Sequence, residues 1–129
     1  MEKGVVMKFY YCEKCDNVIV TLGERGLDVE HNGAINELIP NATEGVGEKH
    51  LPLIKRSKNK VTVNVGEVTH PMEDGHSISL ICLVTDKGCQ FRYLKPPMKP
   101  VVEFLLAEDD EPLMAYAYCN MHGLFMSKL

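Results

Sequence analysis

The chain of 129 residues is 45% hydrophobic and carries a formal net charge of −4 at pH 7. That length and composition suit one buried core, and the acidic balance argues against a nucleic-acid partner. No apolar run is long enough to span a membrane, and residues 1–7 lack the apolar core of a secretory signal. Five irregularly spaced cysteines are typical of thiols or metal ligands in a reducing compartment. We therefore expect a cytoplasmic protein.

The N-terminal part predicts a small β unit. Residues 5–11 are apolar and β-prone, and they run through Cys12-Glu13-Lys14-Cys15 into a second apolar segment, 18–21. This order indicates a strand, a tight knuckle and another strand. The dipeptide Asn32-Gly33 favours a hairpin, although the strand before it is weak. Proline and glycines in residues 39–47 predict a linker, so we expect one domain over 1–38 and a second over 39–129.

The second domain is predicted to be β throughout. No stretch of ten or more residues shows helical periodicity, whereas short segments of β-prone residues recur at short, regular spacing. The mostly apolar segment 78–84 suits a central strand. The expected strands are 61–65, 78–84, 91–94, 101–106 and 114–118. This pattern predicts an all-β fold, and specifically a β-sandwich.

Four of the five histidines lie beside turns or prolines, in loops where a sandwich presents ligands: His50, His70, His76 and His122. The fifth, His31, lies outside this pattern and is given no role. Any one histidine alone would be read as an ordinary surface or half-buried residue. Taken together, the four indicate a shared site.

Cys119 joins these histidines because Cys119-x2-His122 can close on one metal ion, while His70-x5-His76 straddles a single loop. Four imidazoles and one thiolate are one ligand too many for tetrahedral zinc, but they suit a five-coordinate iron with one open position. A thiolate would push electron density onto the metal. We expect the backbone N–H groups of Met121 and His122 to hydrogen-bond the sulfur and tune that donation.

The sequence resembles the superoxide reductases of the desulfoferrodoxin and neelaredoxin family over residues 48–126. The stretch Tyr93-Leu94-Lys95-Pro96 is also similar. The motifs that carry the resemblance are Glu48-Lys49-His50-Leu51-Pro52, Thr69-His70-Pro71-Met72, Gly75-His76-Ser77-Ile78 and Tyr118-Cys119-Asn120-Met121-His122-Gly123-Leu124.

The resemblance implies an immunoglobulin-like β-sandwich preceded by a small desulforedoxin-like β-hairpin domain. It implies one mononuclear iron held by four equatorial histidines and one axial cysteine: His50, His70, His76, His122 and Cys119. The implied reaction is the one-electron reduction of superoxide to hydrogen peroxide, a detoxification of oxidative stress. An external donor such as rubredoxin would restore the iron, and the family suggests a homodimer.

The resemblance also implies roles for the two residues that precede His50. Lys49 would attract the superoxide anion, and Glu48 would supply the carboxylate that binds the sixth iron position in the oxidised state. Without the resemblance, such a charged dipeptide is most often a solvated surface.

The N-terminal unit departs from the family members that hold a second, tetrahedral iron, which needs a later Cys-Cys pair. Cys12 and Cys15 are present, but residues 37–40 read Glu-Leu-Ile-Pro. We interpret this unit as a vestigial desulforedoxin-like domain without iron. Two free thiols in a knuckle are favoured for Cys12 and Cys15, with a reversible disulfide or a metal shared across a dimer as alternatives. Cys82 is expected to be a buried small hydrophobe, and Cys89 is given no role.

Two other functions are compatible with the same residues. One is an iron protein that only carries electrons, which an open sixth position and Lys49 argue against. The other is a zinc-stabilised β-sandwich that serves as a binding module.

Overall fold

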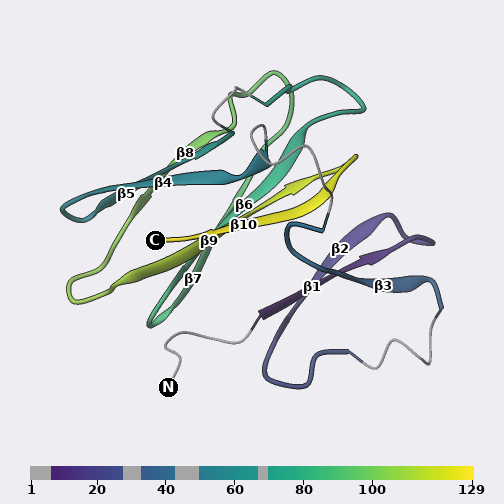
Figure 1. Ribbon diagram of the computed structural model, residues 1–129, viewed down its shortest axis with the longest axis horizontal. Helices are drawn as coiled ribbons and strands as arrows, with labels where there is room; N and C mark the ends of the chain where they lie inside the picture. The colour runs from purple at the N-terminus through teal and green to yellow at the C-terminus, as the bar shows by residue number, and fades with distance from the viewer. Residues whose placement is uncertain (1–6, 28–32, 43–49, 67–69) are drawn as a thin grey trace.

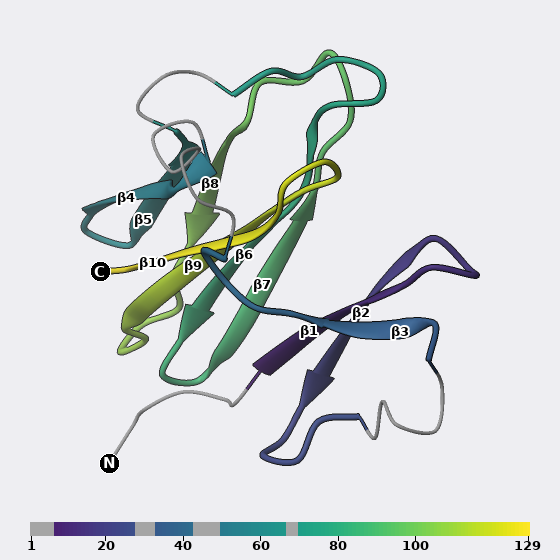
Figure 2. The same cartoon turned by 45° about the vertical axis from the view of Figure 1, so that its right-hand side comes forward.

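The computed structural model describes residues 7–27, 33–42, 50–66 and 70–129. Within these ranges the elements are strands, so the prediction of an all-β fold is confirmed. They form three antiparallel sheets, which Figure 2 shows side by side. No helix in the described part of the chain has the length and apolar character needed to cross a membrane.

The first sheet is N-terminal and has the order β2-β1-β3. Its strands are β1 (Met7–Cys12), β2 (Asn17–Leu22) and β3 (Ile35–Leu38). The predicted strand, knuckle and strand are therefore found in β1 and β2. The short strand β3 lies where the hairpin signal at Asn32-Gly33 implies a strand after the turn, and it pairs with β1. The weak strand expected before Asn32-Gly33 lies outside the described residues.

The other two sheets form the sandwich (Figure 1). One has the order β4-β5-β8, with β4 at Pro52–Ser57, β5 at Lys60–Val65 and β8 at Val101–Leu105. The other has the order β10-β9-β6-β7, with β6 at Ile78–Thr85, β7 at Gly88–Tyr93, β9 at Pro112–Cys119 and β10 at Gly123–Lys128. The central place predicted for the β6 segment is confirmed.

Strand β6 is buried on both faces, which explains its nearly continuous apolar sequence. Ile81 and Leu83 point into the core between the two sandwich sheets, where they meet the inward side chains of β5 and β8. Cys82 and Val84 point the other way, into a second cluster with Phe9 of β1. The N-terminal sheet thus covers a face that a two-sheet sandwich would leave exposed to water.

The chain that leaves the N-terminal sheet is attached to the edge strand β10 by Asn41. The backbone N–H of Asn41 donates to the Leu124 carbonyl at 2.9 Å. Its side-chain amide spans Met126, donating to the carbonyl at 3.0 Å and accepting from the N–H at 2.9 Å. These bonds fix the path from the first sheet to the sandwich.

We predict that Phe9→Ala lowers the free energy of unfolding by about 3–5 kcal/mol, because Phe9 is 1% exposed and its ring packs 4.8 Å from that of Tyr116. Urea denaturation measures this loss. Leu22→Ala is the control on β2, where the side chain is 63% exposed, and should change stability by less than about 0.5 kcal/mol. Equal losses in the two variants would contradict the covering role of the first sheet.

Candidate metal centre

Strand pairing brings the predicted ligand loops to one end of the sandwich. Ile78 at the start of β6 lies opposite Cys119 at the end of β9. Pro52 at the start of β4 lies opposite Val65 at the end of β5. The residues just before β4, between β5 and β6, and between β9 and β10 therefore meet at the same end.

The histidine and cysteine side chains converge there on a common region. His50 Nε2 lies 2.9 Å from His70 Nε2 and 3.1 Å from His122 Nδ1. Cys119 Sγ lies 3.8 Å from His122 Nδ1. Four residues each offer one donor atom, and these four atoms all lie within 4.8 Å of one another: His50, His76, Cys119 and His122. His70 adjoins this group through His50 and through His76, whose ring centroid is 4.8 Å from its own.

The distances between these donor atoms, and the incomplete hydrogen bonding of one of them, fit a metal ion. Two nitrogen ligands about 2.1 Å from one ion and at right angles lie about 3.0 Å apart, close to the distances around His50 Nε2. Among the residues that the structure describes, the buried Nε2 of His76 has no hydrogen-bond partner, although buried polar atoms are nearly always satisfied. A cation among these atoms would supply the missing partner.

His70 is held in the tautomer that a metal ligand requires. Its Nδ1 lies 2.6 Å from the carbonyl oxygen of Pro71, which can only accept, so Nδ1 carries the proton and Nε2 presents a lone pair to the cluster. The pKa of His70 is lowered to about 4, mainly by burial and also by the neighbouring imidazoles, while the hydrogen bond to the Pro71 carbonyl acts in the opposite direction. The ring is consequently neutral at pH 7.

Cys119 is fully buried, and this burial raises the pKa of its thiol. The backbone N–H groups of Met121 and His122 donate to the sulfur and act in the opposite direction, favouring the thiolate. These are the two groups that the sequence predicts beside the sulfur. Because burial dominates, the metal-free protein holds a protonated thiol that a bound metal would deprotonate.

All five residues predicted to bind a metal are therefore brought together. His50 is further fixed by Phe125, whose ring lies 4.6 Å away in a stacked arrangement. Glu48, Lys49 and His31 lie outside the described residues. Nitrogen and sulfur donors of this kind suit iron, zinc or copper rather than magnesium or calcium.

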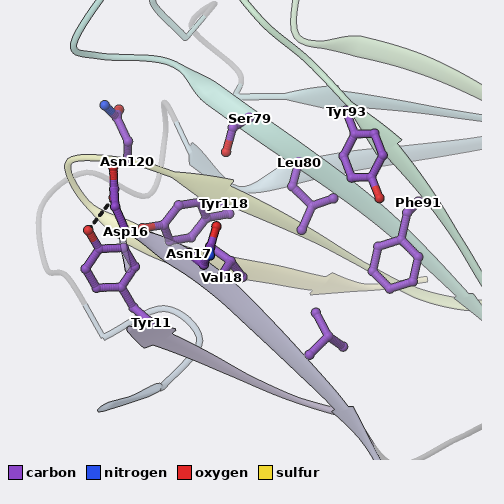
Figure 3. Close-up of a pocket in the computed structure, with 11 residues that line it drawn as sticks. Tyr11, Asp16, Asn17, Val18, Ser79, Leu80, Phe91, Tyr93, Tyr118 and Asn120 are labelled. Atoms are coloured by element: carbon purple, nitrogen blue, oxygen red, sulfur yellow. Dashed lines mark hydrogen bonds between the residues drawn. The ribbon is translucent and has the colours of Figure 1, made fainter. Parts of the chain in front are cut away.

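Sequence reasoning missed Asn120 and the cavity beside it. Asn120 hydrogen-bonds Gly75 and Ser77 across the cluster end of the sandwich. It also borders a cavity of about 670 Å³ between the first sheet and the sandwich. Figure 3 shows Tyr118 and Asn120 beside Tyr11 and Asp16 at one end of that cavity. An asparagine directly after a candidate ligand at a strand end was the available signal.

The cysteines outside the cluster follow the predictions in part. Cys82 is fully buried, and burial raises its pKa, as expected of a small hydrophobe. Cys12 and Cys15 form a disulfide, so the favoured interpretation as two free thiols is wrong. The tight knuckle places their Cα atoms 5.6 Å apart, within the range that a disulfide requires.

Comparison with known proteins identifies the family. The family model of desulfoferrodoxin matches residues 42–128. The chain is 41% identical to a desulfoferrodoxin homolog of Archaeoglobus fulgidus over 124 residues, which covers 95% of this chain and 97% of that protein. It is 38% identical to the desulfoferrodoxin of Nitratidesulfovibrio vulgaris over 117 residues, with 90% and 91% covered.

A solved structure resembles the whole chain. The superoxide reductase from Treponema pallidum matches with a TM-score of 0.82 and 31% identity, covering 97% of this chain and 99% of that one. The superoxide reductase from Giardia intestinalis covers 97% of its own chain but 64% of this one, with a TM-score of 0.54 and 32% identity. With the family match extending over the entire sandwich and the ligand cluster, the chain belongs to the desulfoferrodoxin family.

Proposed function

We propose that this protein is a superoxide reductase with one mononuclear iron per chain. The observation that carries the proposal is the convergence of four imidazoles and one thiol at one end of the sandwich. The likeness to the Treponema pallidum superoxide reductase over nearly the whole chain supports it. The proposed ligands are His50, His70, His76, Cys119 and His122.

Bound iron would supply the single electron that, with two protons, converts superoxide to hydrogen peroxide. The protein's own residues set the conditions for that transfer. The neutral His70 brings no charge to the cluster. The N–H groups that donate to Cys119 Sγ moderate the electron density of the thiolate. His76 and His122 are half-buried rather than fully buried, which leaves one side of the cluster closer to solvent.

The remaining roles complete the proposal. Lys49 draws the anion toward the site, and Glu48 binds the open position in the oxidised state. The N-terminal domain, residues 1–38, acts as a covering layer without iron, while residues 39–129 form the catalytic domain. A small cytoplasmic electron donor such as rubredoxin returns the electron, and the protein works as a homodimer.

The stoichiometry of the superoxide reaction tests the proposal. We expect the pre-reduced, iron-loaded protein to form one hydrogen peroxide per superoxide consumed while one iron is oxidised. Dismutation would form one peroxide per two superoxides, with oxygen as the other product. A pure electron carrier would leave superoxide unconsumed. Pulsed generation of superoxide, followed by peroxide, oxygen and absorbance measurements, separates these results, and either of the last two would overturn the proposal.

We predict that Lys49→Ala slows the reaction with superoxide about tenfold and weakens its dependence on ionic strength, because a local positive charge raises the encounter rate of an anion. The iron content should not change. Lys55→Ala is the matched control, since Lys55 is an exposed lysine on β4. If the two variants react at the same rate, Lys49 has no steering role.

We predict that metal binding releases about one proton per ion at pH 8, because the Cys119 thiol has a raised pKa and must lose its proton to bind. Metal affinity should therefore rise with pH until the thiol ionises. Adding Fe²⁺ under anaerobic conditions to a weakly buffered solution with a pH indicator measures the release. Cys119→Ser should release far less, and an equal release from both proteins would exclude Cys119 as a ligand.

A further inference from the structure

Asn120 follows Cys119 directly and ties together two of the loops that carry candidate ligands. Its side-chain Oδ1 accepts a hydrogen bond from the Ser77 backbone N–H at 2.9 Å. Its Nδ2 donates to the Gly75 carbonyl at 2.9 Å. Its own backbone N–H donates to the Ser77 carbonyl at 3.3 Å. One residue therefore makes three bonds to the two neighbours of His76.

The backbone of His76 is fixed from the other side as well. Its N–H donates to the Glu73 carbonyl at 3.1 Å, and its carbonyl accepts from the Glu73 N–H at 3.0 Å. Between these bonds and those of Asn120, the peptide units on both sides of His76 are tied down. The imidazole then has only its side-chain torsions left to adjust. It contributes a donor atom to the cluster, and its Nε2 is buried with no hydrogen-bond partner in the described part of the chain.

We propose that Asn120 is a positioning residue that fixes His76 relative to Cys119, and so sets the geometry and affinity of the metal centre. The inference rests on the proposed metal centre. Hydrogen-bonded groups outside the ligand set commonly change metal affinity by about 10–100-fold. Asn120 acts on the same centre twice, because its backbone continues from one ligand while its side chain holds the loop of another.

Asn41 provides a matched comparison elsewhere in the fold. Its side chain makes the same kind of two-sided amide contact, to the N–H and the carbonyl of Met126, on the edge strand β10. Replacing either asparagine by aspartate keeps the acceptor and the size of the side chain but removes the amide donor. A general loss of structure would follow from both changes, whereas an effect on the metal would follow only from Asn120→Asp.

The experiment uses Co²⁺ as the probe in the full chain. We expect Asn120→Asp to lose metal to a competing chelator at concentrations roughly tenfold lower than the wild type needs, and to shift the thiolate-to-cobalt absorption. Asn120→Ala, which removes both side-chain bonds without adding charge, should act in the same direction. Asn41→Asp should leave retention and spectrum unchanged. Unchanged metal properties in both Asn120 variants, or equal changes in Asn41→Asp, would overturn the inference.

A double-mutant cycle with His76→Ala tests the route of the effect. If Asn120 acts through His76, then Asn120→Asp changes Co²⁺ affinity little once His76 is alanine, whereas an additive loss would contradict the inference. The two proposals fail differently. A wild type that binds no metal, or a His76→Ala variant with wild-type affinity, would refute the proposed metal centre itself. A metal-binding wild type with indifferent Asn120 variants would refute only the positioning role.

Discussion

The metal centre depends on the antiparallel pairing of β6 with β9. Placing Ile78 opposite Cys119 fixes the distance between the loop that holds His76 and the turn that holds His122. A register slip of one residue would turn Cys119 to the other face of the sheet. Both faces of β6 are buried in separate clusters, so this strand is held between the two halves of the core. The first sheet contributes Phe9 to the second of these clusters and covers it, so it supports the site from a distance.

The same arrangement creates a local conflict in the absence of metal. The Nε2 of His50 lies within 3.1 Å of ring nitrogens of both His70 and His122, and the Nε2 of His76 is buried with no hydrogen-bond partner among the residues that the structure describes. Burying such groups costs free energy that the surrounding core must offset. A bound cation removes the conflict and adds its binding energy to folding, so the stability of the protein and its metal content are expected to be linked.

Much of this could be predicted from the sequence because the signals were local. Alternating or apolar runs marked β5, β6 and β9. The histidines beside turns and prolines, together with Cys119, marked the cluster. The edge strands β4 and β10 were missed because Lys55-Arg56-Ser57 is polar and β10 directly follows the site turn. The bonds of Asn120 to residues more than 40 positions away depend on strand register, which composition does not reveal. The knuckle disulfide likewise depends on local backbone geometry.

X-ray absorption at the iron edge of the loaded protein can decide whether these five residues bind the iron, because it counts the atoms bound to the metal. We expect one sulfur and four imidazole nitrogens around a single kind of iron, with the sulfur lost in Cys119→Ser. A shell of nitrogen and oxygen alone, or one of four sulfurs, would contradict it.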